Sequence, residues 1–161
     1  MATLTTTITE ALTLNGKDRG STNTLTITGI DNVFHRIVTL ADDMANATLV
    51  SFKSLINVAD GAIDRTHVKY LRVTNLDGAN PVILNIQQRE DEGDGVGDKN
   101  LGVLLSAGKS FMMGEAKESI DVGGGANDID ALTDLHDVES IMADPLSEAV
   151  QVEIFIAMAV A

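Results

Sequence analysis

The sequence predicts an all-β protein, an antiparallel β-sandwich of jelly-roll type with about ten short strands and at most one short helix. Three observations predict this fold class. Apolar and polar residues alternate with period two through much of the chain, which is typical of strands with one buried face. Turn signals rich in Gly, Asn, Asp and Pro separate these runs. The 161 residues are 44% hydrophobic and 22% charged, which indicates a single globular domain spanning 1–161.

The first third of the chain predicts a hairpin followed by two strands. Residues 4–14 are expected to form a strand with one buried face, and Asn15-Gly16 begins a turn that leads into a second strand over 24–28. Residues 33–40 are apolar on both faces, so we expect a strand in the middle of the sandwich. Residues 48–52 are expected to pair nearby. The even positions that define the first strand are Leu4, Thr6, Ile8, Leu12 and Leu14.

The middle of the chain predicts one further hairpin and then two more strands, after a connection over 54–66. The segment 67–87 contains two strand-like runs around Asp77-Gly78, a strong signal for a hairpin turn. Residues 101–105 and 109–113 are then expected to be two strands separated by a tight turn.

The C-terminal part predicts one more hairpin, formed by 138–143 and 150–160. Residues 128–137 fit a short helix capped by Asp128 and a loop equally well. The last strand is apolar on both sides in its second half, which favours a central strand or a subunit interface because such a surface is rarely left in water. Its candidate interface residues are Ile154, Phe155, Ile156, Met158 and Val160.

Composition excludes several classes of function. The net charge of −13 argues against nucleic-acid binding, which needs Lys and Arg to displace condensed counterions. Aromatic residues make up only 3%, too few for a platform that stacks sugars. The absence of Cys excludes disulfides and thiolate metal sites. No apolar run approaches the roughly 20 residues that span a bilayer, so we expect a soluble protein without a membrane partner and without a signal for export.

No pattern of residues predicts catalysis or a cofactor. His35, His67 and His136 lie in no metal-ligand spacing, and no nucleophile elbow or phosphate-binding glycine motif is present. The glycine-rich run 123–128 resembles one copy of a calcium-binding repeat that needs stacked copies, so a hinge is the favoured interpretation. An acidic loop within 89–100 is a weak candidate Ca²⁺ site, but it lacks the spacing of an EF-hand and a solvated loop is favoured. Its carboxylates are Glu90, Asp91, Glu92, Asp94 and Asp98.

Four segments of the sequence resemble small virion proteins of tailed bacteriophages, especially those of marine and cyanobacterial hosts. They are the opening residues 1–30, the segment 68–87, GKSFMMG at 108–114 and VQVEIFIAMA at 150–159. The resemblance spans nearly the whole chain and carries no catalytic residues. It implies a non-enzymatic structural protein of the particle, made in the host cytoplasm.

Within that class, we expect a capsid decoration or cement protein on the outside of the head. Such proteins are commonly compact β-sandwiches that sit as trimers and bridge neighbouring capsomers, so the expected partners are further copies of this chain and the major capsid protein. Three alternatives remain: a tail or head-to-tail accessory protein, a module that binds carbohydrate or the host surface, and an enzyme of β-sandwich fold, for which the sequence offers no site.

Overall fold

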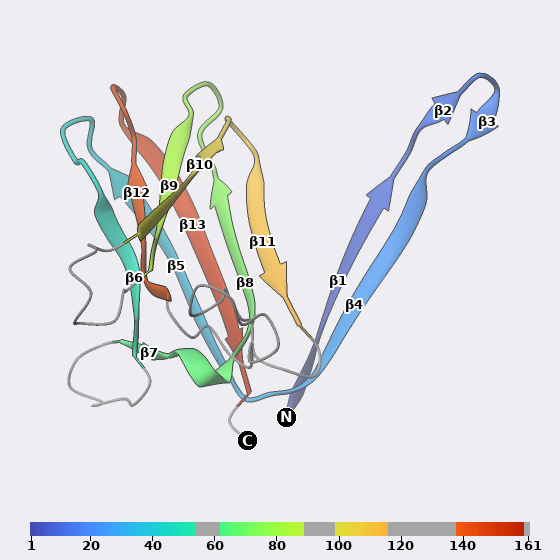
Figure 1. Cartoon of the computed structure of the whole chain (residues 1–161), viewed down its shortest axis with the longest axis horizontal. Helices are drawn as coiled ribbons and strands as arrows, with labels where there is room; N and C mark the ends of the chain where they lie inside the picture. The colour runs from blue at the N-terminus through green and yellow to red at the C-terminus, as the bar shows by residue number, and fades with distance from the viewer. Residues whose placement is uncertain (54–61, 89–98, 116–137, 160–161) are drawn as a thin grey trace.

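The computed structural model describes residues 1–53, 62–88, 99–115 and 138–159, and these form an all-β sandwich with a projecting two-stranded arm (Figure 1). One sheet of the sandwich has the strand order β10-β9-β12-β6-β7, and the other has the order β11-β8-β13-β5. The bounds of the sandwich strands are β5 Asn32–Leu40, β6 Ala47–Lys53, β7 Ile63–Asp64, β8 Val68–Asn75, β9 Val82–Gln88, β10 Lys99–Leu105, β11 Ser110–Gly114, β12 Val138–Asp144 and β13 Val150–Met158.

The strand order is that of a jelly roll. Successive long strands alternate between the two sheets, and β9 and β10 are the one consecutive pair of long strands that are neighbours among the described residues of the sandwich. All pairings of long strands are antiparallel, while the two-residue strand β7 adds to β6 in parallel. A 3-10 turn at Arg65–His67 then leads from β7 into β8. The predicted antiparallel sandwich is therefore confirmed.

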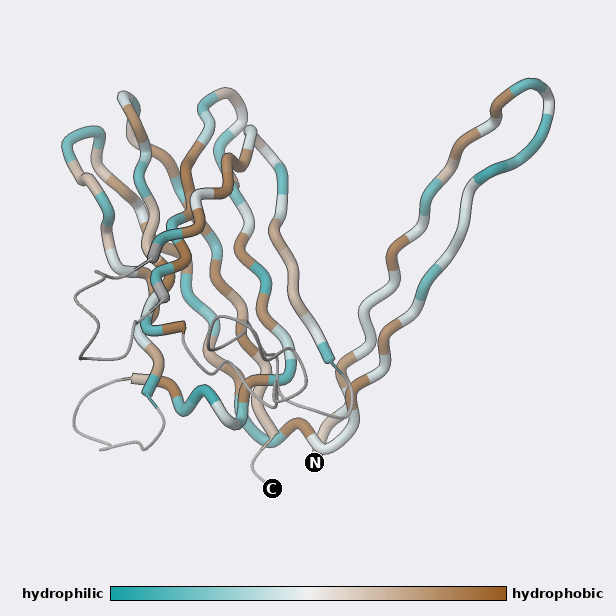
Figure 2. The backbone as a smooth tube through the Cα atoms, viewed as in Figure 1, coloured by the Kyte–Doolittle hydropathy of each residue, from teal (hydrophilic) through white to brown (hydrophobic). Residues whose placement is uncertain are grey.

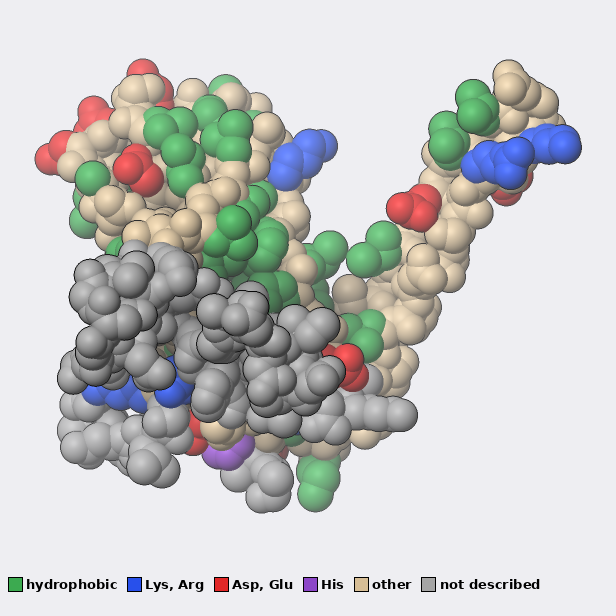
Figure 3. Space-filling model, in the orientation of Figure 1, with side chains coloured by type: hydrophobic (Ala, Val, Ile, Leu, Met, Phe, Trp, Pro, Cys, Tyr) green, Lys and Arg blue, Asp and Glu red, His purple; other side chains and the backbone are tan. Residues whose placement is uncertain are grey.

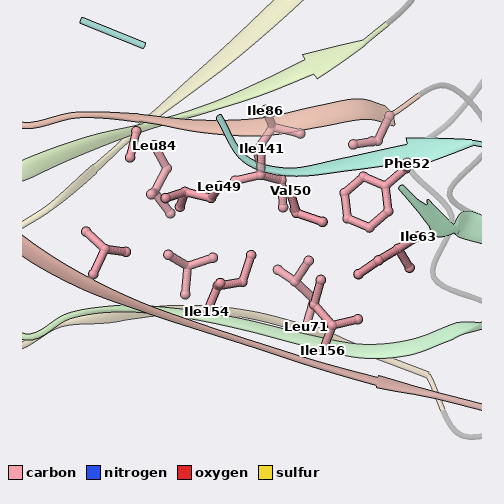
Figure 4. Close-up of a cluster of buried hydrophobic side chains, with 14 of the residues drawn as sticks. Leu49, Val50, Phe52, Ile63, Leu71, Leu84, Ile86, Ile141, Ile154 and Ile156 are labelled. Atoms are coloured by element: carbon pink, nitrogen blue, oxygen red, sulfur yellow. The ribbon is translucent and has the colours of Figure 1, made fainter. Parts of the chain in front are cut away.

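The core lies between the two sheets and consists almost entirely of aliphatic side chains (Figure 4). β13 is a central strand, paired with β5 on one side and β8 on the other. Its alternate residues point inward, and Ile154 and Ile156 are fully buried. They meet Leu84 and Ile141 from the opposite sheet. The expectation that the last strand is central is thus confirmed by its pairing.

The predicted hairpin over 67–87 is wrong in its pairing. The two runs form β8 and β9 as strands, but these lie in different sheets, so the Asp77-Gly78 turn joins the sheets instead of folding one strand back on its neighbour. The same correction applies to the predicted hairpin of β12 with β13. The two strands predicted around the tight turn at 106–108 are formed as β10 and β11, and they also lie in different sheets. A turn signal fixes where the chain reverses, whereas the pairing depends on partners supplied from elsewhere in the sequence.

The chain reversal between β8 and β9 is organised by a buried asparagine. The Asn75 side chain has 0% exposure, and its Nδ2 donates to the carbonyl oxygens of Asn80 at 2.8 Å and Leu105 at 3.1 Å. Its Oδ1 accepts from the backbone N–H of Asp77 at 3.0 Å. Asp77 Oδ1 in turn accepts from the N–H groups of Ala79 and Asn80. These hydrogen bonds tie the reversal to the end of β10.

Two expectations about burial are also corrected. β5 was expected in the middle of the sandwich, but it is an edge strand, with Val33 46% and Ile37 57% exposed on its outer side. The first strand was expected to bury one face, but most of that face is exposed. The partners that would cover these apolar side chains are not among the described residues of this chain. The predicted element at 128–137 lies outside those residues.

Candidate functional site

The arm is a long antiparallel ribbon that leaves the base of the sandwich and points away from it (Figure 1). It consists of β1 (Ala2–Glu10) and β4 (Ser21–Ile30), and the hairpin predicted for this part of the sequence is confirmed. At its far end the short strands β2 (Thr13–Leu14) and β3 (Lys17–Asp18) flank a turn at Asn15 and Gly16, both with positive φ. Asn-Gly is the sequence that this kind of two-residue turn prefers.

One face of the arm is a ladder of threonines. Threonine suits a strand because its branched side chain packs on the pleated surface, and its hydroxyl keeps that surface wettable. In one of these pairs the two hydroxyl oxygens, Thr7 Oγ1 and Thr24 Oγ1, lie 3.3 Å apart. Four cross-strand pairs form the ladder: Thr3 with Thr28, Thr5 with Thr26, Thr7 with Thr24, and Thr9 with Thr22.

The opposite side, which we call the inner face of the arm, carries its apolar residues. These alternate with the threonines along both strands (Figure 2). Near the root they pack on the outer surface of the β11-β8-β13-β5 sheet, where Ile27 and Ile30 are buried against Tyr70 and Ala157. Further out the inner face continues without cover. The inner face comprises Leu4, Thr6, Ile8, Asn23, Leu25 and Ile27.

The distal arm, residues 8–23, exposes three large apolar side chains and has no net charge, because its two acidic residues balance its two basic ones. Ile8 is 47% exposed, and Leu12 and Leu14 are each 55% exposed. In the space-filling view, hydrophobic side chains are spaced along the arm and Lys and Arg gather near its tip (Figure 3). Exposed apolar residues in a row on a projecting element indicate a contact surface more than a fold requirement.

Two glycines shape the arm. Gly29 has φ +79° beside the register shift near Thr3, so it provides the β-bulge that bends the arm at its root. At Gly20, a Cβ would lie 2.2 Å from the carbonyl oxygen of Glu10, which only a glycine avoids. Next to it, the Ser21 hydroxyl donates to Glu10 Oε2 at 2.7 Å. The direction of the arm is therefore set by backbone geometry at both ends.

An apolar cleft of about 290 Å³ opens where the arm leaves the sandwich. Tyr70 and Leu25 form its floor. Both side chains pack closely against Gly114 of β11, because this residue has no side chain. A Cβ on Gly114 would lie 2.7 Å from Leu25 Cδ2 and 3.0 Å from Tyr70 Cδ2. The inner face of the arm forms one wall, with Ile8, and β11 forms the other, with Met112 at 40% exposure.

Beside the cleft, the outer surface of the same sheet carries an ionic cluster centred on Glu153. Its Oε1 lies 2.8 Å from His35 Nε2, and its Oε2 accepts a hydrogen bond from Arg72 Nη2 at 2.5 Å. The guanidinium of Arg72 lies over the Phe155 ring, 5.8 Å from its centroid, and His35 and Tyr70 contact the same ring edge-on. Both carboxylate oxygens are engaged, so Glu153 links His35 of β5 to Arg72 of β8 across the outer surface of the sheet.

The structure distributes the sequence-predicted site residues among several places. Ile154, Ile156 and Met158 lie in the core of the single chain, and Phe155 alone of the described interface candidates faces outward. Val160 and the acidic loop Glu90, Asp91, Glu92, Asp94 and Asp98 lie outside the described residues. Within the described ranges, no three His, Asp or Glu side chains converge in a way that would hold a metal ion.

Sequence reasoning missed the cleft and its floor. Gly114 and Tyr70 give no local signal, because their role depends on a contact between segments far apart in the chain. A usable signal did exist in the arm, since threonine on every alternate position of β1 marks a strand that cannot bury both faces.

Comparison with known proteins adds no relative: no family model, no curated protein and no solved structure matches this chain. In the described part of the chain no helix is long and apolar enough to cross a membrane.

Proposed function

We propose that this protein is a non-enzymatic structural component of a tailed-phage particle, a decoration protein that sits on the outside of the head and bridges capsomers. The observation that carries the proposal is the arm. A two-stranded ribbon is marginally stable by itself in water, and here its distal half diverges from the sandwich and leaves Ile8, Leu12 and Leu14 exposed (Figure 1). Such an element gains order when it lies on a neighbouring subunit.

The sandwich supports the proposal because its jelly-roll topology provides a rigid scaffold for the arm. A jelly roll is a rigid two-layer unit that recurs in viral capsid proteins and lectins. The sequence segments that resemble phage virion proteins include the whole arm, the β8–β9 region, β11 and β13. The resemblance therefore covers both the scaffold and the element that reaches out from it.

The charge distribution favours a protein partner over DNA. Residues 1–30 contain two acidic and two basic side chains, so the net charge of −13 resides entirely on residues 31–161. A neutral arm can approach a charged neighbour without repulsion, whereas the acidic sandwich would be repelled by packaged nucleic acid. This arrangement suits a protein that contacts the outside of a shell.

The test is the number of copies per particle, measured by quantitative mass spectrometry on purified virions of the phage that encodes the chain. A shell built from repeated capsomers offers on the order of hundreds of equivalent sites, so the proposal expects a copy number of that order. A copy number of a few tens or fewer would assign the protein to the tail instead, and its absence from particles would refute both locations.

A second measurement links the copy number to the arm. Virions that carry Leu12→Ser and Leu14→Ser are expected to lose the protein more readily in dilution than virions that carry Leu104→Ser. Leu104 is a matched control because it is 61% exposed on β10, in the opposite sheet. Equal retention of both variants would contradict a role for the arm in holding the protein on the shell.

A further inference from the structure

We propose that the occupant of the cleft is the distal arm of a second copy of this chain. This inference concerns contacts between copies of the purified protein and does not depend on where the protein lies in a particle. Each copy would supply an arm and receive one, either by reciprocal exchange in a dimer or around a closed ring such as the expected trimer.

The first support is continuity with a contact that the chain already makes. Near the root, Leu25 and Ile27 from the inner face pack against Tyr70 and Phe155 on the sheet. Further along the same face, Ile8 repeats the apolar chemistry, and Leu12 and Leu14 extend it beyond β1, with no cover from the described residues. A surface that accepts the proximal arm in one copy therefore has the right chemistry to accept the distal arm of another.

The second support is that the arm of one copy only lines its own cleft, with Ile8 and Asn23, and beyond these residues it leads away from that cleft. The bulge at Gly29 and the contact of Leu25 with Tyr70 above Gly114 direct the arm away from the sheet. In Figure 1 the arm and the sandwich diverge from a common base, and the space between them widens toward the tip. The distal arm therefore extends toward a neighbour.

The third support is size. The seven residues from Ile8 to Leu14, which include the end of β1 and all of β2, reach about 20 Å when extended, while four strands of a sheet span about 15 Å between their outer members. The distal arm can thus cross the outer surface of a neighbour's β11-β8-β13-β5 sheet. A ribbon that packs face to face on a sheet lies about 10 Å from it. The arm of one copy would therefore form a third layer over the two sheets of its neighbour.

The fourth support is charge. Two sandwiches that each carry −13 repel one another, but the arm contributes no net charge to the contact. Association through the arm therefore avoids the strongest repulsion between copies. Because screening by salt weakens the repulsion between sandwiches, self-association should strengthen as ionic strength rises.

The experiment is sedimentation equilibrium of the purified full chain from about 1 to about 100 µM, a range that detects contacts of moderate affinity. The wild type is expected to form a defined dimer or trimer. Leu12→Ser combined with Leu14→Ser should raise the dissociation constant by about tenfold or more, whereas Leu104→Ser should leave it unchanged. Circular dichroism at a concentration at which all three proteins are monomeric should show the same melting temperature, because the substituted side chains are exposed in the single chain.

A monomeric wild type throughout that range would overturn the inference, and so would an oligomer that the arm variant leaves intact. Dissociation by Leu104→Ser as well would place the contact on the other sheet and equally overturn it. None of these outcomes bears on the copy number in virions, so failure of this inference and failure of the proposed function are distinguishable.

Disulfide trapping locates the contact directly, since the natural chain has no cysteine to interfere. A Leu14→Cys protein is mixed with a Met112→Cys protein that bears a larger tag, and the mixture is oxidised. A disulfide needs Cα atoms within about 7 Å, so a mixed product forms only if the arm of one copy reaches the cleft of another. An equal yield from Leu14→Cys with Leu104→Cys would show random collision and refute the placement.

Discussion

Replacing Gly114 with alanine should loosen the root of the arm while the sandwich stays folded. The added Cβ would lie 2.7 Å from Leu25 Cδ2 and 3.0 Å from Tyr70 Cδ2. Overpacking of this kind costs about 1–3 kcal/mol. The better strand conformation of alanine returns about 0.5–1 kcal/mol. The difference between the two ranges is about 0–2.5 kcal/mol, so we expect Gly114→Ala to lower the free energy of unfolding by about 1 kcal/mol.

The free energy of burial at the root of the arm indicates how the arm responds to Gly114→Ala. Burial of the two isoleucines at the root, Ile27 and Ile30, contributes about 3–6 kcal/mol, which exceeds the overpacking cost. The arm should consequently shift on the sheet without detaching. Tyr70 is 5% exposed under the arm and is the chain's one tyrosine, in a chain without tryptophan. Its emission therefore reports on the root of the arm alone.

The assay combines urea unfolding with quenching of Tyr70 emission by acrylamide under native conditions. Gly114→Ala should unfold at lower urea and be quenched more strongly than the wild type. Gly102→Ala is the matched control, because Gly102 also lies on an edge strand, β10, and a Cβ there would meet only Ile83 Cγ2 at 3.9 Å. If Gly114→Ala proves as stable as Gly102→Ala and leaves quenching unchanged, the packing of the arm over Gly114 is wrong.

Three further predictions test the sandwich. Ile154→Asp should abolish folding, because an unpaired charge in the fully buried centre of β13 costs several kcal/mol, and soluble protein with a wild-type dichroism spectrum would contradict this. Asn75→Ala should lower the free energy of unfolding in urea by about 2–4 kcal/mol, since it leaves buried groups at the β8–β9 reversal unpaired, and a loss below about 1 kcal/mol would disprove that role. Hydrogen bonds from the backbone N–H groups of Asn80 and Ala79 lower the pKa of the Asp77 carboxyl, so its stabilisation is full above the unfolded pKa and is lost as the pH falls through the lower folded value. The stability advantage of wild type over Asp77→Asn should accordingly be constant near neutral pH and shrink in acid, and an advantage that grew in acid would contradict the assignment.

Much of the fold could be predicted from local sequence, and the exceptions have physical causes. The strands around Leu84 and Ile154 follow from period-two alternation, which is a property of each segment by itself. Their pairing is not local: the Asp77-Gly78 signal is the same whether the chain reverses within one sheet or passes to the other. The edge position of β5 was missed for a related reason, since Val33 and Ile37 have the pattern of a doubly buried strand but remain exposed.

The candidate site was predictable only in part. The hairpin of the arm follows from Asn15-Gly16 and the alternation around it. Its exposure arises because no described strand lies over the distal parts of β1 and β4, and the local sequence of one segment does not show this. The floor of the cleft joins Leu25, Tyr70 and Gly114 from three separate parts of the chain. Contacts of such long range leave no trace in the local pattern.

The central position of β13 has a consequence for how the chain reaches its native state. β13 supplies the partner of both β5 and β8, yet it is synthesised long after them. Until it arrives, these two strands present free edges and apolar side chains to the solvent. Native topology of this kind, dominated by contacts between distant segments, is typical of slow folding and of exposure to aggregation on the way. The strands of the arm are close in sequence, but its root packs on Tyr70 of β8 and Ala157 of β13, so both the arm and the sandwich should be completed only after β13 has left the ribosome.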